Sequence, residues 1–196
     1  MTRIAVLVSG GGSNLAALLD AQKAGRFGGG VISLVISSRP GVYALERAAA
    51  AGVKSVVISA DKISGDELDI ALLGCLEEND ISLVVLAGFL RVVGSRVLLR
   101  YQGRVINIHP SLLPKFGGKG MYGLRVHRAV LESGAKVTGA TVHLVSEVVD
   151  GGEILLQKQV PVLPGDTPEK LSRRVAGQAE QIILPQAVAN LLEGMV

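Results

Sequence analysis

The first half of the chain alternates short apolar runs with longer stretches in which apolar residues recur every three or four positions. The short runs, rich in valine, isoleucine and leucine, span 4–8, 31–37, 55–58, 83–86 and 104–108. Runs of this kind are typical of strands buried on both faces of a parallel sheet. The stretches 14–24, 42–51 and 66–78 are predicted helices, and another short helix precedes the fifth strand. The alternation predicts βαβ units with right-handed crossovers.

The pattern changes after residue 114. The glycine-rich segment 115–123 predicts a loop, 126–133 a short helix, and 137–145 and 153–161 two strands. We expect these two strands, the first with an exposed face, to pair as an antiparallel hairpin at the edge of the sheet. The tail 167–192 predicts a long helix that Thr167 caps and that Pro185 kinks or breaks. The chain is therefore predicted to form one α/β domain with a mostly parallel sheet.

The composition removes several classes of protein. The 196 residues contain 25 glycines, against a typical share of about 7%, but these follow no triplet period, which excludes collagen. A single cysteine, Cys75, excludes an internal disulfide and a cysteine-based zinc site, and we expect no metal. A net charge of only +3 and 3% aromatic residues do not suit nucleic-acid binding. We see no membrane span and no signal region, and we expect a cytoplasmic protein.

A glycine turn, Ser9-Gly10-Gly11-Gly12-Ser13-Asn14, joins the first strand to the first helix. Glycines let the backbone approach a ligand closely, and a helix N-terminus presents free N–H groups to an anion. The turn lacks the Gly-Lys-Ser/Thr ending of a Walker A motif, and Leu15 replaces the last glycine of G-x-G-x-x-G. The alternative is a tight turn capped by Ser13 or Asn14. We favour a site for one phosphate, formed by Gly11, Gly12, Ser13 and Asn14.

The fifth strand leads into Asn107-Ile108-His109-Pro110. Asn107 and His109 are two residues apart in an extended chain, so their side chains point to the same side. Ligands of open α/β sheets bind at the carboxyl ends of strands. An amide there can stabilise a developing oxyanion, and an imidazole can move a proton near neutral pH. This setting favours catalysis over a purely structural histidine.

A histidine that acts as acid or base needs a carboxylate to orient it. Asp150 is the candidate, because its Asp-Gly-Gly turn between two apolar strands could fold the side chain back. The alternative is a simple hairpin turn. Asp61, Asp66 and Asp69 are expected to be solvated charges without a role.

Five segments together resemble the phosphoribosylglycinamide formyltransferases, the folate-dependent enzymes of purine synthesis. They are Ser-Gly-x-Gly-Ser-Asn at 9–14, Leu-Ala-Gly-Phe-x-Arg at 86–91, Asn-Ile-His-Pro-Ser-Leu-Leu-Pro at 107–114, Gly-x-Thr-Val-His at 139–143 and Asp-Gly-Gly at 150–152. The resemblance covers essentially the whole chain. It implies a Rossmann-like formyltransferase fold, with a phosphate-binding half at about 1–100 and a folate-binding and catalytic half at about 101–196.

The resemblance also implies an activity, the transfer of a formyl group from 10-formyltetrahydrofolate to the amine of glycinamide ribonucleotide. By similarity, Asn107, His109 and Asp150 form the catalytic group. His143 lies on a predicted strand near the site, and we favour a structural or supporting role over a catalytic one, because most buried histidines are simply hydrogen-bonded. Asn107 and protonated His109 would stabilise the oxyanion. His109, or a water held by Asp150, would relay the proton to the folate nitrogen. The transfer is direct and needs no metal.

The resemblance places the ribonucleotide phosphate on the glycine turn. It assigns Glu180 to the ribose and Lys170 to the phosphate. The spacing from Glu180 to Pro185 matches the family, whereas the histidine that follows the family's glutamate is absent, and Arg173-Arg174 stands about one residue out of register.

The folate is expected to lie between two segments and to be read mainly by backbone groups. They are Phe89, Leu90, Arg91, Val92 and Val93, and Val145, Ser146, Glu147, Val148, Val149 and Asp150. The backbone of Leu90 and Pro110 is expected to reach the substrate amide.

Three alternatives share parts of the pattern. A formyltetrahydrofolate deformylase, a hydrolase, would carry an N-terminal regulatory domain, and a first strand that starts at Arg3 leaves no room for one. A methionyl-tRNA formyltransferase would need a C-terminal RNA-binding domain. A binding protein without catalysis would not need Asn107, His109 and Asp150. We therefore expect small-molecule substrates, no nucleic acid or membrane partner, and a monomer or homodimer.

Overall fold

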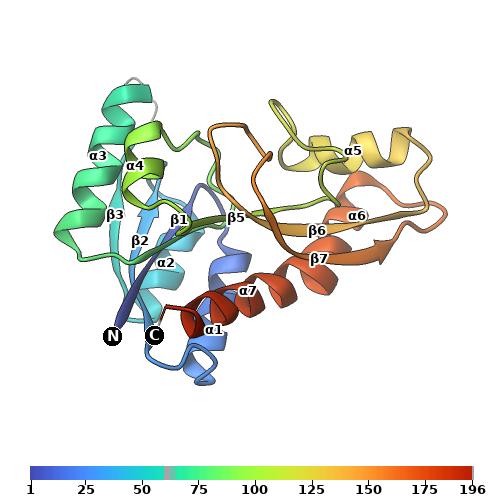
Figure 1. Ribbon diagram of the computed structural model, residues 1–196. Coiled ribbons are helices and arrows are strands. Elements are labelled where there is room, and N and C mark those ends of the chain that lie inside the picture. Colours follow the sequence, from blue (N-terminus) through green and yellow to red (C-terminus); the bar gives the residue numbers. More distant parts are fainter. Residues whose placement is uncertain (60–62, 64, 196) are drawn as a thin grey trace. The chain divides into compact units, whose positions relative to one another are not determined.

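The computed structural model describes residues 1–59, 63 and 65–195, so Asp61 lies outside the described residues. The strands are β1 (Thr2–Val8), β2 (Gly30–Ser37), β3 (Lys54–Val57), β4 (Leu83–Leu86), β5 (Val105–His109), β6 (Val137–Leu144) and β7 (Ile154–Pro161) (Figure 1). The helices are α1 (Ser13–Lys23), α2 (Tyr43–Ala50), α3 (Gly65–Glu78), α4 (Ser95–Arg100), α5 (Leu124–Glu132), α6 (Pro168–Val175), the π-helix η1 (Ala176–Glu180) and α7 (Gln181–Glu193). None of the helices in this described part is long and apolar enough to cross a membrane.

The strands form a sheet in the order β3-β2-β1-β4-β5-β6-β7. The predicted α/β class is confirmed, with a mostly parallel sheet and one antiparallel hairpin. The chain divides into two compact units. The first comprises Met1–Ile106 and the end of the chain from Val188, and the second comprises Asn107–Ala187.

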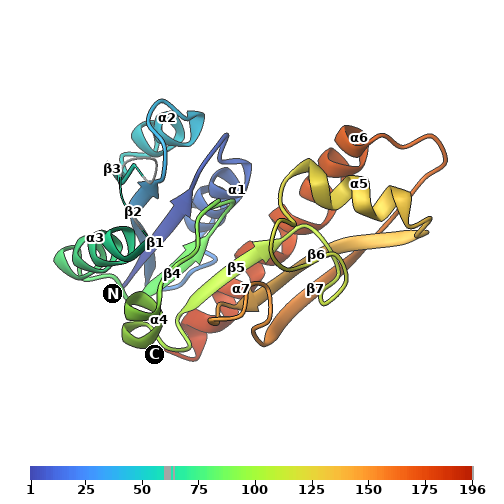
Figure 2. The same cartoon turned by 90° about the horizontal axis from the view of Figure 1, so that it is seen from above.

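In the first unit, β1 pairs in parallel with β2 and with β4, and β2 pairs in parallel with β3, as the alternating pattern predicts. Figure 2 shows α1 and α2 on one side of these strands and α3 and α4 on the other. Every residue of β4, and β1 from Ile4 onward, is buried. This aliphatic core explains the apolar runs, because helices cover both faces of these strands.

Strand β3 differs from the prediction. Its residues are mostly exposed, and Val57 keeps 41% of its surface accessible. The strand lies at the edge of the sheet and pairs only with β2. An apolar run therefore did not by itself indicate burial on both faces.

The glycine turn positions helix α1. Gly12 is the N-cap, with a left-handed φ of 71°, and no side chain caps the helix, so neither Ser13 nor Asn14 takes that role. A Cβ at Gly12 would lie 2.8 Å from Ala44 Cβ on α2. Glycine is required here by both its conformation and its close approach to α2.

Asp69 corrects a further expectation. It is 4% exposed, and its carboxylate accepts hydrogen bonds from the backbone N–H groups of Arg96 and Val97 at the start of α4. It is therefore a buried cap for a neighbouring helix and not a solvated charge.

The second unit contains the predicted hairpin. Strands β6 and β7 pair antiparallel, with an irregularity between Val142 and His143. The expected exposed face of β6 is wrong, because six of its eight residues are buried. Helices α5 and α6 lie side by side (Figure 2).

The C-terminal helix is irregular, but not where Pro185 predicts. Thr167 accepts a hydrogen bond from the backbone of Lys170 and Pro168 begins the helix, as predicted. The helix then widens into η1, and Pro185 lies inside α7 without breaking it. Pro185 is the fifth residue of α7, so the hydrogen bond it cannot donate would end on Gln181 at the junction with η1.

Candidate active site

The carboxyl end of β5 carries two polar side chains of the second unit. Asn107 is half-buried, and His109 is 4% exposed. Ile108, between them, is buried. The strand alternation therefore presents an amide and an imidazole on one side, which is the placement that the spacing predicts.

Asp150 reaches this site from the turn between β6 and β7. Its φ of 56° is left-handed, a conformation that aspartate tolerates better than most residues. The turn is closed by a hydrogen bond from Gly151 N–H to the carbonyl of Val148. A Cβ at Gly152 would overlap the backbone of Leu144, so only glycine lets the chain return to β7 here.

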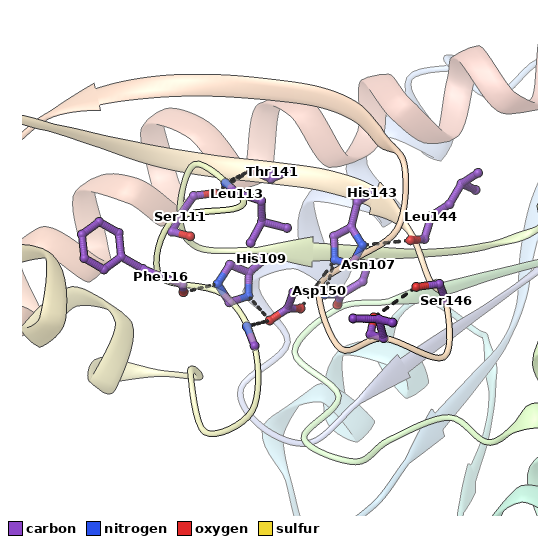
Figure 3. A network of polar contacts seen from close by, with 12 residues as sticks. Asn107, His109, Ser111, Leu113, Phe116, Thr141, His143, Leu144, Ser146 and Asp150 are labelled. Carbon is purple, nitrogen blue, oxygen red and sulfur yellow. Dashed lines mark hydrogen bonds and ion pairs between the residues drawn. The ribbon is translucent and has the colours of Figure 1, made fainter.

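Four side chains form one polar network (Figure 3). Nδ1 of His109 lies 3.4 Å from Oδ2 of Asp150, and Nε2 of His143 lies 3.6 Å from Oδ1. Nδ2 of Asn107 lies 3.0 Å from Nε2 of His143. The structure thus brings together the three residues predicted to be catalytic, and His143 joins Asn107 to Asp150.

The irregularity in the hairpin coincides with His143. A bulge re-aims a side chain relative to a regular strand, and bulges are common next to active sites. Nδ1 of His143 lies 2.9 Å from its neighbour's carbonyl, that of Leu144, which fixes the ring.

The segment 115–123 is a loop, as predicted, and its backbone contacts the network. The carbonyl of Phe116 lies 2.9 Å from Nε2 of His109, and Gly118 donates its N–H to Oδ2 of Asp150 at 2.9 Å. The hydroxyl of Ser111 donates to the carbonyl of Lys115 at 2.6 Å and holds the start of the loop. Sequence reasoning missed these contacts because backbone groups leave no residue signature.

The electrostatics of the network follow from burial and pairing. Burial lowers the pKa of His109 below its ordinary value, although Asp150 and the Phe116 carbonyl act in the opposite direction. Burial alone would raise the pKa of Asp150, but contacts with His143, His109 and Gly118 bring it below its ordinary value. The pair therefore combines an ionised carboxylate with an imidazole that gives up its proton readily.

His127, on α5, is a buried histidine whose titration is affected by His109. It is 1% exposed on α5, and its Nδ1 has no hydrogen-bond partner. Burial and the charge of His109 lower the pKa of His127 to about 4. It is therefore a neutral histidine near neutral pH.

The glycine turn belongs to the first unit. Ala44 donates its N–H to the carbonyl of Gly10, and Nε of Arg47 donates to the carbonyl of Gly11 at 2.9 Å. The Arg47 guanidinium also lies 4.8 Å from the centre of the Tyr43 ring. Arg47 is thus a cation at the predicted phosphate site that sequence reasoning missed, because 36 residues separate it from Gly11.

The segment 89–93 also lies in the first unit. Phe89 and Val93 are buried, whereas Leu90 and Val92 are exposed. Leu90 donates its N–H to the hydroxyl of Ser9 at 2.8 Å, so this N–H is already bonded within the protein and the carbonyl is the backbone group that could contact a ligand. Proline has no N–H, so Pro110 also offers only its carbonyl.

The remaining candidates lie in the second unit. In the turn before Asp150, Val148 and Val149 are exposed. Lys170 is an exposed residue of α6, and Glu180 is the last residue of η1. Single turns of π-helix are frequent at functional sites, which agrees with a binding role for Glu180.

The fold and the network define a class, an α/β protein with a buried acid–base group at the end of a central strand. Residues 2–188 match the family model described as formyl transferase. The chain therefore belongs to the formyl transferase family.

Individual relatives are also similar along almost the whole of this chain. The chain is 44% identical over 194 residues to the trifunctional purine biosynthetic protein adenosine-3 of Drosophila melanogaster, which covers 98% of this chain and 14% of that protein. It is 38% identical over 182 residues to the chloroplastic phosphoribosylglycinamide formyltransferase of Arabidopsis thaliana, covering 92% of this chain and 62% of that protein. It thus spans less than two thirds of the length of these relatives.

A solved structure has the same fold. Glycinamide ribonucleotide transformylase 1 from Symbiobacterium toebii superposes with a TM-score of 0.92 at 45% sequence identity. The match covers 99% of this chain and 89% of that one.

Proposed function

We propose that the chain is a phosphoribosylglycinamide formyltransferase, which transfers the formyl group of 10-formyltetrahydrofolate to the amine of glycinamide ribonucleotide. The names of its relatives, which include a purine biosynthetic protein, support this reaction. The observation that carries the proposal is the network of Asn107, His109, His143 and Asp150. It combines an amide that can donate a hydrogen bond to an oxyanion with a histidine–aspartate pair that can move a proton.

Each member of the network has a proposed task. The folate supplies the activated formyl group. Asn107 donates an N–H to the negative charge that develops on the formyl oxygen when the amine attacks. His109 takes the proton of the amine and returns it to the leaving nitrogen. Asp150 stabilises the imidazolium, and His143 orients the amide of Asn107.

The proposed binding residues follow the sequence prediction. Gly11, Gly12, Ser13 and Asn14 would hold the phosphate through backbone N–H groups and the α1 N-terminus, with Arg47 bracing the turn. Lys170 and Glu180 would contact the phosphate and ribose, and the carbonyls of Leu90 and Pro110 the amide. The first half of the chain would thus supply the phosphate-binding turn, while the second half would carry catalysis, the contacts of Lys170 and Glu180, and part of the folate site.

The proposed folate contacts are Phe89–Val93 and Val145–Asp150. Each segment exposes apolar side chains, with Val92 at 70% and Val148 at 68%, which suits a ligand with a partly apolar ring system. A cytoplasmic location and a monomeric or homodimeric state remain predictions from the sequence.

The test is an assay with 10-formyltetrahydrofolate, with and without glycinamide ribonucleotide. We expect folate turnover only when the ribonucleotide is present, and formation of formylglycinamide ribonucleotide. Turnover without the ribonucleotide would indicate a hydrolase and would contradict the proposal.

Variants test the roles of individual residues. His109→Ala should lower kcat by about 10²–10⁴-fold, the usual contribution of a positioned acid–base group. Asp150→Ala should also lower kcat severely. Glu132→Ala is the matched control, because it removes an exposed carboxylate from α5 of the same unit. Near-normal turnover by His109→Ala would overturn the assignment of proton transfer.

A further inference from the structure

We propose that the backbone carbonyl of Phe116 anchors Nε2 of His109, so that Nδ1 is the atom of His109 that carries the proton during formyl transfer. This inference deepens the proposed function and rests on it. Phe116 is then a positioning residue, which acts through its carbonyl and not through its ring.

The anchor follows from what a carbonyl can do. The distance of 2.9 Å between Nε2 and the Phe116 oxygen is that of an ordinary hydrogen bond. A carbonyl oxygen only accepts, so Nε2 must carry a hydrogen whether the ring is neutral or charged. The neutral form of His109 therefore has its lone pair on Nδ1.

The other nitrogen is less constrained. Nδ1 lies 3.4 Å from Oδ2 of Asp150, longer than a good hydrogen bond, and this oxygen already accepts the N–H of Gly118. In the neutral ring a lone pair therefore faces a carboxylate. Gaining a proton at Nδ1 turns this repulsion into attraction, so Nδ1 is the basic atom.

His143 has the opposite arrangement. Its Nδ1 lies 2.9 Å from the carbonyl of Leu144, so its neutral ring carries the hydrogen on Nδ1. Its Nε2 then accepts one N–H of Asn107 at 3.0 Å, whereas Oδ1 of Asp150, at 3.6 Å, lies beyond hydrogen-bond distance of this nitrogen. The second N–H of the Asn107 amide remains available for the oxyanion.

The loop that carries the anchor is held in place. The Ser111 hydroxyl binds the carbonyl of Lys115, and Gly117 packs so closely that a Cβ there would overlap Cδ2 of Leu113 and lie 3.3 Å from Cβ of Asp150. Phe116 itself has a left-handed φ of 58°, which turns its carbonyl. The loop geometry thus fixes both His109 and Asp150.

The proton cycle balances. The attacking amine gives its proton to Nδ1 of His109 as the new carbon–nitrogen bond forms. Nδ1 gives that proton to the folate nitrogen as the old bond breaks, so the enzyme returns to its starting state. The titratable groups that act on His109 are Asp150, His143 and His127, and Asp150 carries the opposite charge that stabilises the intermediate imidazolium.

Nitrogen-15 NMR of the imidazole rings tests the assignment directly. The chain has three histidines, and His127→Gln and His143→Gln variants assign their signals. We expect neutral His109 to carry its hydrogen on Nε2 and neutral His143 to carry it on Nδ1. On acidification the Nδ1 signal of His109 should change from unprotonated to protonated, while its Nε2 stays protonated. A neutral His109 with its hydrogen on Nδ1 would overturn the proposal.

A loop variant connects the anchor to catalysis. Gly117→Ala should displace the Phe116–Gly117 peptide, and Lys119→Ala, an exposed change in the same loop, is the control. We expect Gly117→Ala to give a mixture of His109 tautomers and about a tenfold lower kcat, with KM for the ribonucleotide within about twofold. Wild-type kcat despite mixed tautomers would refute the catalytic role of the anchor.

Separate measurements test the formyl transfer and the tautomer of His109. Absence of formyl transfer by the wild type would overturn the proposed function, and with it the role of the anchor. The tautomer assignment would still be judged separately by the NMR spectra.

Discussion

Replacing His127 by leucine should make the protein more resistant to acid. His127 is buried, its Nδ1 has no hydrogen-bond partner, and its pKa in the folded protein is about 4, against an ordinary value of 6.5. Between these two pH values the unfolded chain binds a proton at His127 that the folded chain does not. Stability must therefore fall as the pH drops through about 6.5, and the loss is complete below about 4.

The magnitude follows from the pKa difference. A fall of the pKa from 6.5 to about 4 corresponds to a loss of about 3 kcal/mol in the free energy of unfolding once the pH lies below both values. Between pH 7 and pH 5 the loss is about 2 kcal/mol. At pH 7 leucine removes a polar atom without a partner, so the variant should lie within about 1 kcal/mol of the wild type.

Urea unfolding at pH 7 and pH 5 measures this effect. The free energy of unfolding of His127→Leu, relative to the wild type, should rise by about 2 kcal/mol between the two pH values. Other groups titrate in both proteins and cancel in the difference. His127→Gln is the control for packing, because it also lacks a titrating ring and should show the same pH dependence. An unchanged difference between wild type and His127→Leu at the two pH values would refute the reasoning.

Three further substitutions test other parts of the structure. Gly152→Ala places a Cβ into the backbone of Leu144 and should displace the turn that carries the catalytic carboxylate, lowering kcat about 100-fold or more in the transfer assay. Asp69→Ala leaves two N–H groups of α4 without their cap and should lower the free energy of unfolding by about 1–2 kcal/mol in urea, with a smaller loss for Asp69→Asn. Arg47→Ala should raise KM for the ribonucleotide about tenfold with little change in kcat, because the turn loses its brace, whereas the exposed Arg26→Ala should change neither.

The sequence predicts the order and type of the elements well, because apolar periodicity directly reflects which faces are buried. It predicts burial less well. Strand β3, predicted from a short apolar run, lies at the sheet edge and is mostly exposed, whereas β6 alternates and is nevertheless buried. Asp69 was misjudged for the same reason, since the N–H groups that it caps lie 27 and 28 residues away.

The candidate site, too, could be predicted only in part from the sequence. Asn107 and His109 could be placed together from their spacing, because two residues on one strand share a face. The approach of Asp150 and His143 depends on a hairpin turn and a bulge, for which the sequence offers glycines but no geometry. The Phe116 carbonyl could not be found at all, because any residue would supply the same carbonyl oxygen.

The π-helix η1 has a geometric consequence for the C-terminal tail. One extra residue in a regular α-helix would rotate everything after it by about 100°. A π-helical turn takes up one residue more than an α-helical turn, so the following helix keeps its phase. If Arg173-Arg174 stands one residue out of register, as the resemblance implies, a turn of this width between Arg174 and Gln181 would take up that residue. A tail with such a turn can therefore change length by one residue without rotating α7 about its own axis.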